Sequence, residues 1–174
     1  LAHVSGLPVK HFIAACNSND TVPQFMETEK YEPKHSVATI SNAMDVGNPS
    51  NFVRVLELFH QQVSDLKNVF SSVSVSDDDT RKAIKRVYDD TGYMLDPHGA
   101  VAYKALEDYL QVNKNDDGII LETAHPVKFP DVVEDLLMIK IPLPENAHEL
   151  FNKEKKSVLL EAGFEQVKDW MLSR

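Results

Sequence analysis

The chain has 174 residues, of which 43% are hydrophobic and 26% are charged. This length suits one compact domain, and the charge content argues against a disordered chain and against a membrane-spanning segment. The 18 basic and 27 acidic residues give a net charge of -9, the wrong sign for attraction to nucleic acid or to anionic lipid. We therefore expect a soluble globular protein with neither partner. A reducing cytoplasm is expected because the single cysteine, Cys16, cannot form an internal disulfide.

Short apolar runs alternate with stretches of helical periodicity along the chain. The run VKHFIAAC at 9–16 predicts a buried strand. A helix should follow, because Asp20 or Thr21 can cap its first amide groups and Pro23 is tolerated in a first turn. Residues 31–48 show little period and predict a long loop, a kind of segment that is often functional.

The next segments predict a helix and a second strand. Ser50 can cap a helix with apolar residues at spacings of three and four. These apolar residues are Val53, Leu56, Phe59 and Val63. The segment NVFSSVSVS at 68–76 alternates with period two and predicts a strand.

An acidic triplet, 77–79, marks the start of another helix, since carboxylates favour the positive end of the helix dipole. Its inward positions should be Ala83, Ile84, Val87 and Tyr88. Adjacent helical positions diverge, so we do not interpret the triplet as a metal site.

Asp96 and Pro97 form a cap and a first-turn proline for a further helix, which places His98 at a helix N-terminus. The inward stripe of this helix should be Val101, Ala105, Leu106 and Tyr109. GIILETA at 118–124 then predicts a third strand that ends near Thr123.

The C-terminal part begins with VVEDLLMIKIPLP at 132–144, which predicts a helix that passes into a fourth strand. Residues 145–174 should be largely helical, with a break near Gly163. The pattern predicts one α/β domain over 1–174, with an open, mainly parallel sheet of about four strands flanked by helices. Ligands of such sheets bind beyond the carboxyl ends of the strands, where polar residues gather here. These clusters are 17–20, 74–77 and 123–128.

Four segments resemble the motifs of one enzyme family, in the same order. They are ACNSNDTVPQF, SVATISNAMDVGNPSNFVR, GYMLDPHGAVAY and TAHPVKF. They look like the corresponding motifs of the threonine synthases, and the resemblance covers essentially the whole chain. Two departures, Glu29 where the family often has glycine and Val127 where alanine is commoner, remove no group that we assign to chemistry.

The resemblance implies a fold type II pyridoxal-phosphate enzyme that converts O-phospho-L-homoserine and water to L-threonine and phosphate. In this family the cofactor forms a Schiff base with a lysine in the N-terminal part of the chain. The resemblance therefore implies that 1–174 is the C-terminal portion of a longer enzyme and part of its large domain. It implies no catalytic residue in this chain and no activity of the chain by itself. Its natural partner would be its own N-terminal domain, and without that domain we expect exposed apolar area and self-association.

By the same similarity, Thr123 would place its hydroxyl against the pyridine nitrogen of the cofactor. A hydroxyl, unlike a carboxylate, does not hold that nitrogen protonated. The alternative is that Thr123 caps the turn beginning at His125.

Other residues of the matched motifs are candidates for the pocket wall or for contacts to the substrate. They are Asn17, Asn19, Asp20, Ser41, Asn42, Asp45, Asn51, Arg54, His98, His125 and Lys128. Purely structural roles stay open for all of them, since these residue types are also common in turns and caps. For His98 we favour packing, and the helix dipole should keep its ring neutral. The histidine spacing predicts no metal site.

Two other interpretations stay open. The chain could belong to another pyridoxal-phosphate lyase or phospholyase of the same fold. It could also be a non-catalytic scaffold that lacks the cofactor segment.

Overall fold

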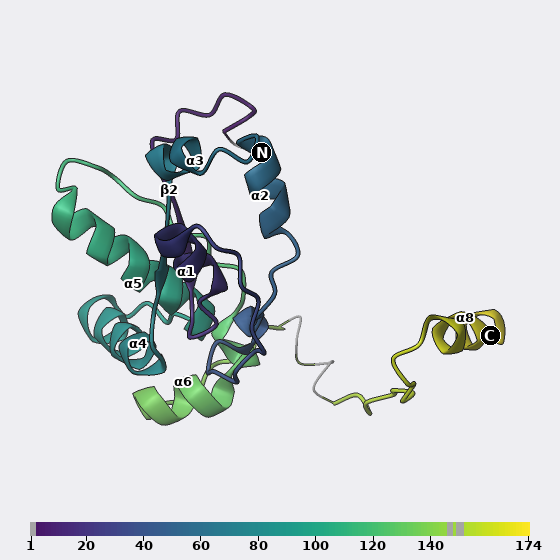
Figure 1. Ribbon diagram of the computed structural model, residues 1–174. Helices are drawn as coiled ribbons and strands as arrows, with labels where there is room; N and C mark the ends of the chain where they lie inside the picture. Colours follow the sequence, from purple (N-terminus) through teal and green to yellow (C-terminus); the bar gives the residue numbers. More distant parts are fainter. Residues whose placement is uncertain (1–2, 146–147, 149–151) are drawn as a thin grey trace. The chain divides into compact units, whose positions relative to one another are not determined.

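The computed structural model describes residues 3–145, 148 and 152–174, and it divides into two compact units, Leu1–Ile141 and Pro142–Arg174. The elements of the first unit, with η for a 3-10 helix, are in chain order β1 Phe12–Cys16, α1 Thr21–Thr28, η1 Asn42–Met44, α2 Phe52–Leu58, α3 Val63–Val69, β2 Phe70–Ser74, α4 Asp77–Thr91, α5 Pro97–Val112, η2 Pro126–Lys128 and α6 Pro130–Leu137 (Figure 1). No described helix combines the length and the apolar content that crossing a membrane requires.

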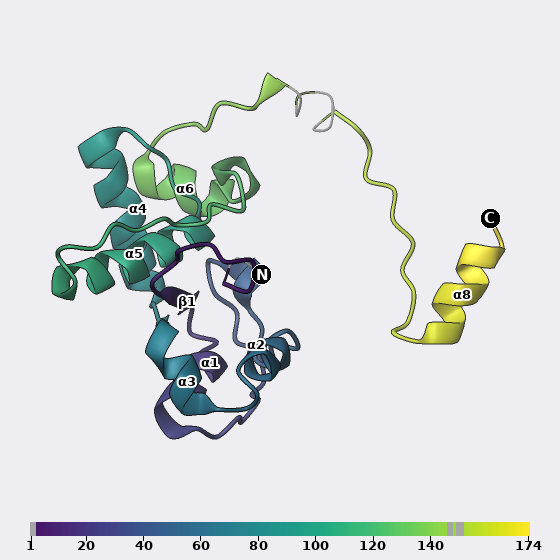
Figure 2. The same ribbon diagram turned by 90° about the horizontal axis from the view of Figure 1, so that it is seen from above.

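The sheet consists of β1 and β2, which run parallel with Phe12 opposite Phe70. Helix α1 packs against both strands and α5 packs against β1 (Figures 1 and 2). Because alternate residues of a strand face opposite sides, Ala14 packs among residues of α1, α2 and α3, whereas Ile13 lines a groove beside α5. The predicted α/β fold with a parallel sheet flanked by helices is confirmed.

Two apolar clusters fill the first unit. One joins α4, α5 and α6 through a central group of buried side chains, and the other lies among α1, α2, α3 and the strands. The buried members of the first cluster are Ala83, Ile84, Val87, Leu95, Ala100, Val133 and Leu137. Those of the second are Val22, Phe25, Phe52 and Leu66. These two apolar clusters support the groove and the polar sites described below.

The predicted number of strands is wrong, because the described residues form two strands rather than about four. Residues 118–124 are extended but pair with neither β1 nor β2. They lie against α5 instead, so close that a Cβ on Gly118 would fall 2.3 Å from the Leu106 side chain. Residues 138–144 also form no strand, and Pro142 and Pro144 there lack the N–H that a ladder needs.

The predicted helix from Ser50 to Val63 is interrupted. It is divided into α2 and α3 by a turn in which His60 and Gln61 have φ values of 50° and 61°. The expected stripe is also shifted, because Val53 is 54% exposed and Phe52 is buried in its place. A break that puts two residues in the left-handed region leaves little trace in hydrophobic periodicity.

Most predicted helix starts are confirmed. Ser76 caps α4 by accepting a hydrogen bond from the Asp79 amide, and the acidic triplet occupies the first turn. Asp96 caps α5, with Pro97 in its first turn. At α1, however, Asp20 occupies the cap position without a side-chain bond to the helix amides.

The second unit contains α8, Phe164–Leu172, which begins directly after Gly163. Gly163 therefore marks the start of a helix rather than a break within one. The expected helix over 145–162 is wrong for 152–162, where no helix is found. The highly charged run NKEKK has no apolar stripe to bury there. Residues 146, 147 and 149–151 lie outside the described residues.

Candidate functional site

The carboxyl end of β1 is tied to the long loop by Asn17. This buried side chain places its amide nitrogen 2.8 Å from the Thr39 hydroxyl, 2.8 Å from a carboxylate oxygen of Asp45 and 3.1 Å from the Ser41 hydroxyl. Asp45 in turn accepts hydrogen bonds from the hydroxyl and the amide of Thr39. The loop is thus folded around one buried asparagine.

Asn19 adds a second anchor. It donates to the carbonyl of Val37 at 3.0 Å and accepts from the amide of the same residue at 2.8 Å. Its own amide donates to the Asn17 side chain, so the two asparagines act together. The neighbouring Asp20 forms an ion pair with Lys34 at 3.0 Å and accepts a hydrogen bond from the Gln24 side chain at 3.0 Å. Four predicted site residues, Asn17, Asn19, Ser41 and Asp45, are therefore brought together, and their contacts here are with the protein.

Three other predicted residues lie apart from this network. Asn42, Asn51 and Arg54 are exposed, the first in η1 and the other two at the start of α2. Asn51 holds the cap position of α2 without a side-chain bond to it.

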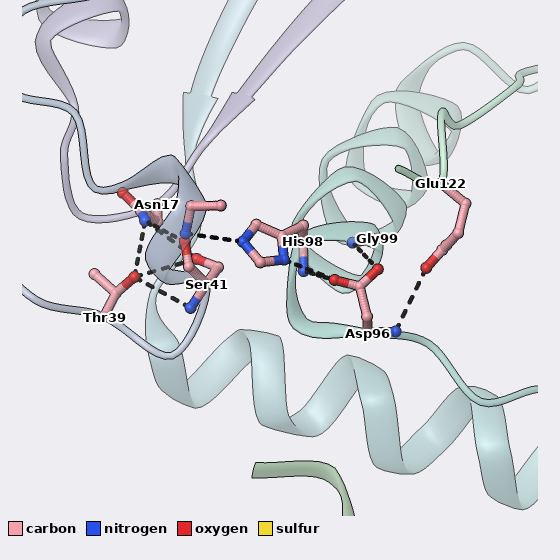
Figure 3. Close-up of polar contacts among 8 residues, drawn as sticks. Asn17, Thr39, Ser41, Asp96, His98, Gly99 and Glu122 are labelled. Carbon is pink, nitrogen blue, oxygen red and sulfur yellow. Dashed lines mark hydrogen bonds and ion pairs between the residues drawn. The ribbon is translucent and has the colours of Figure 1, made fainter. Parts of the chain in front are cut away.

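A second polar cluster surrounds the first turn of α5 (Figure 3). The Asp96 carboxylate accepts bonds from the amides of His98 and Gly99, at 2.9 and 3.3 Å, as an N-cap does. The same carboxylate lies 2.7 Å from Nδ1 of His98. On the other side, the Asp96 amide donates to Oε1 of Glu122 at 3.4 Å.

The hydrogen bonds of His98 identify its tautomer. Nε2 lies 3.1 Å from the amide nitrogen of Ala43, and a backbone N–H can only donate. Nε2 must therefore be the unprotonated nitrogen, so Nδ1 carries the hydrogen and donates to Asp96. His98 is neutral, as expected from its position, and its ring also packs on Phe129 with centroids 4.8 Å apart.

Burial and a neighbouring carboxyl set the ionisation of this cluster. Burial and the hydrogen bond with Asp96 raise the pKa of Glu122 to about 7. Burial alone would also raise the pKa of Asp96, but the hydrogen bonds from Glu122 and His98 outweigh it and hold that pKa below its usual value. Oε2 of Glu122 is buried without a hydrogen-bond partner among the described residues. The proton of the pair thus resides on Glu122.

A groove of about 910 Å³ lies between the start of β1, one face of α5 and the segment 115–123 that follows this helix. Apolar side chains such as Ile13 and Leu106 form much of its wall, and His98 and Thr123 contribute polar atoms. The mouth carries an ion pair of Lys10 with Asp116 at 2.7 Å. The groove is mainly apolar, with polar and charged side chains such as His11, Tyr109 and Asp117 along it, a lining that suits a small organic ligand.

The alternative role for Thr123, capping the turn at His125, is wrong. η2 begins at Pro126, and its cap is the ring of His125, which accepts a bond from the Val127 amide at 3.1 Å. Thr123 is exposed and faces the groove. Lys128 ends η2 with an exposed side chain.

Two members of these clusters were missed by sequence reasoning. Thr39 was not singled out within the loop, where its residue type carries no distinctive signal. Glu122 did carry one, because it is the single charged residue in the apolar run GIILETA. A carboxyl in such a run must either reach solvent or find a buried partner.

Cys16 packs against the second apolar cluster, and burial raises the pKa of its thiol. Among the described residues, no group of three or more His, Cys, Asp or Glu side chains is arranged to hold a metal ion.

Two family models match the chain. Residues 3–122 match the model described as pyridoxal-phosphate dependent enzyme, and residues 99–171 match the model described as threonine synthase, C-terminal. Together they cover nearly all of the chain.

Curated relatives match over the same length. The threonine synthase of Escherichia coli (strain K12) is 42% identical over 173 residues, which are 99% of this chain and 40% of that protein. The threonine synthase of Haemophilus influenzae is 41% identical over 172 residues, again 99% of this chain and 40% of that protein. The chain thus spans about 40% of the length of these relatives.

Solved structures agree. A crystal structure of threonine synthase from Escherichia coli superposes with a TM-score of 0.88 at 41% identity and covers 99% of this chain, which spans 39% of that one. A crystal structure of PLP-bound threonine synthase from Brucella melitensis gives a TM-score of 0.77 at 27% identity and covers 97% of this chain, or 41% of that one.

Proposed function

We propose that this chain, which belongs to the pyridoxal-phosphate dependent enzyme family, is the C-terminal part of a threonine synthase. The complete enzyme converts O-phospho-L-homoserine and water to L-threonine and phosphate. The observation that carries the proposal is the similarity over the whole chain, at 41% identity and a TM-score of 0.88 to one solved threonine synthase.

The groove fits the ring of pyridoxal 5'-phosphate. Its walls are largely apolar, and Thr123 supplies an exposed hydroxyl on one side. When bound, the cofactor supplies an electron sink for charge that develops on the carbons of the substrate. The Thr123 hydroxyl would donate to the ring nitrogen without protonating it, which would keep that sink moderate.

The other predicted residues then divide into two groups. Asn17, Asn19, Ser41 and Asp45 shape the wall of the pocket through the bonds that fold the loop. Asp20 holds the same loop from outside through Lys34. His98 and His125 fix local backbone, at Ala43 and at Val127. The exposed Asn42, Asn51, Arg54 and Lys128 stay candidates for contacts to the phosphate of the substrate.

The remaining features follow the family. We propose that the complete protein is a fold type II enzyme of the cytoplasm. This chain forms an α/β portion of it and packs against the N-terminal domain of the same protein. That domain would carry the lysine that holds the cofactor, which is why the chain by itself is expected to be inactive. The net charge of -9 supports a role without nucleic acid or a membrane surface.

The test is phosphate release from O-phospho-L-homoserine by the full-length protein and by its Thr123→Ala variant. The loss of a hydrogen bond to the cofactor should slow release about tenfold, and the absorption spectrum of the bound cofactor should change. Thr91→Ala is a matched control, since Thr91 lies at the exposed end of α4.

The possible outcomes separate the interpretations. Release by the parent with an unimpaired Thr123→Ala variant would remove Thr123 from the cofactor site. Cofactor binding without phosphate release would favour a related lyase, and no cofactor binding would favour a scaffold.

A further inference from the structure

We infer that Glu122 is a positioning residue, whose carboxyl docks on the start of α5 and so turns the side chain of Thr123 into the groove. The inference rests on the proposed function for the role of Thr123. The docking of Glu122 itself stands on the contacts below.

The direction of the segment 119–123 supports the inference. In extended backbone successive side chains point to opposite sides. Ile119 and Leu121 are 90% and 79% exposed, and Thr123 is exposed with them along the groove. Ile120 and Glu122 alternate with these residues and are less exposed. Ile120 borders the groove but also packs on the cluster of α4, α5 and α6, and Glu122 reaches the start of α5. A segment held by Ile120 and Glu122 must present Thr123 outward.

The carboxyl of Glu122 fits closely against α5. It accepts from the Asp96 amide at 3.4 Å, and a Cβ on Gly99 would lie 2.2 Å from Oε2 and 2.4 Å from Oε1. The carboxyl therefore occupies space that a glycine at 99 leaves open (Figure 3). This contact is specific in shape, because alanine at 99 would displace it.

The docking requires a proton. Asp96 already accepts from two backbone amides and from His98, so it acts as the ionised partner. Two ionised carboxylates in contact would repel each other, whereas a protonated Glu122 can donate to Asp96. Oε2 of Glu122 is buried and has no hydrogen-bond partner among the described residues. If it carries the proton, it can act as a donor.

Among the described residues around this site, the pair of Glu122 and Asp96 is the group that we expect to titrate. From α5, the groups that face Glu122 are Asp96 and, beyond it, His98. The faces of α4 and α6 that pack toward the start of α5 carry apolar residues. On the loop side, Asp45 is bound by Asn17 and Thr39, and Asp77 accepts from the Ile40 amide.

The sign of the pH dependence follows from the raised pKa of Glu122, about 7 against the ordinary value of 4.5. A group whose pKa is raised by folding contributes its stability fully below its ordinary pKa, and the contribution is lost as the pH rises through the folded value. Docking of the segment should therefore weaken progressively from about pH 4.5 and level off above about pH 7.

The experiment uses the full-length protein, freed of cofactor, as parent and as Glu122→Gln and Glu122→Ala variants. Glutamine keeps the shape and a donor but cannot ionise. The probe is pyridoxal 5'-phosphate, titrated by protein fluorescence from about pH 6 to about pH 8.5. The ratio of the apparent Kd of the parent to that of the Gln variant cancels the titration of the cofactor and of the distant lysine.

We expect this ratio to rise about fivefold across the range, the effect of one hydrogen bond, and to level off above the pKa of about 7. The Ala variant should bind weakly at every pH. A ratio that is independent of pH, or an Ala variant that binds like the parent, would overturn the inference. If the Ala variant does not fold, the Gln variant alone decides.

A second measurement separates this inference from the proposed function. Amide hydrogen exchange of 118–128 in the cofactor-free protein reports docking without any ligand. After correction for the intrinsic rate, the parent should lose protection relative to the Gln variant at high pH. If cofactor does not bind or Thr123→Ala has no effect, the proposed function fails while this readout still tests Glu122. If cofactor binds and protection of parent and variant stays equal, Glu122 alone is refuted.

Discussion

Replacing Gly99 with alanine tests the contact between the start of α5 and Glu122. The new Cβ would lie 2.2 to 2.5 Å from the carboxyl atoms of Glu122, which is closer than any real contact of such atoms. The obstructing group is the end of a side chain, so Glu122 should swing away while the backbone stays in place. The substitution therefore breaks the Glu122–Asp96 interaction selectively.

Two opposing effects determine how much Gly99→Ala changes the stability of this region. Alanine in a helix is favoured over glycine by at most about 1 kcal/mol. The interaction that we infer between protonated Glu122 and the ionised Asp96 is a hydrogen bond to a charged group, which contributes about 1.5 to 3 kcal/mol. With the full helical gain of alanine, the net effect of Gly99→Ala should be a destabilisation of about 0.5 to 2 kcal/mol.

The assay is a double-mutant cycle with Glu122→Ala, read by hydrogen exchange of the peptide that covers the first turns of α5. Once the carboxyl is removed, Gly99→Ala meets no obstacle and should be neutral or stabilising by up to about 1 kcal/mol. The coupling between the two sites should thus be about 2 kcal/mol. Equal effects of Gly99→Ala in both backgrounds, within about 0.5 kcal/mol, would refute the reasoning about this contact.

Two further predictions concern other parts of the chain. Asn17→Ala should lower the free energy of unfolding by about 2 to 3 kcal/mol, because buried acceptors lose their donor. The variant should also expose 31–48 to limited proteolysis. Asn68→Ala on the exposed face of α3 is the control, and equal cleavage of both variants would contradict the anchoring role. Without its proposed N-terminal domain, the chain should self-associate through apolar side chains such as Ile119 and Leu121, which are 90% and 79% exposed. Lysine at both positions should reduce the mass measured by light scattering. A parent chain that stays monomeric over a wide concentration range would contradict this prediction.

Local chemistry made much of the fold predictable. The start of α5 follows from Asp96 and Pro97, because a cap acts on amides two or three residues away. The start of α4 follows from the acidic triplet, which favours the positive end of the helix dipole. Strand pairing was not predictable in the same way. Residues 118–124 have the composition of a strand, but a strand exists only where a neighbouring backbone accepts its hydrogen bonds.

The candidate site shows the same contrast between local signals and long-range contacts. Sequence motifs placed Asn17, Asn19 and Asp45 among the candidates, yet only the folded loop shows that their polar groups bind one another. The pairing of Glu122 with Asp96 joins residues far apart in the sequence through a gap at Gly99. Such a contact depends on the packing of an extended segment against a helix, which no local pattern encodes.

The bonds of the long loop have a consequence for ligand affinity. Residues 31–48 take their shape from Asn17, Asn19 and Thr21, each bonded to the loop at 3.0 Å or less. Freezing the backbone of one residue costs about 1 to 2 kcal/mol of conformational entropy, whereas a micromolar complex has only about 8 kcal/mol in total. A loop of this length that became ordered only on contact would consume the whole affinity of a small molecule. Here that ordering belongs to folding, so a ligand beside the loop keeps its binding energy for its own contacts.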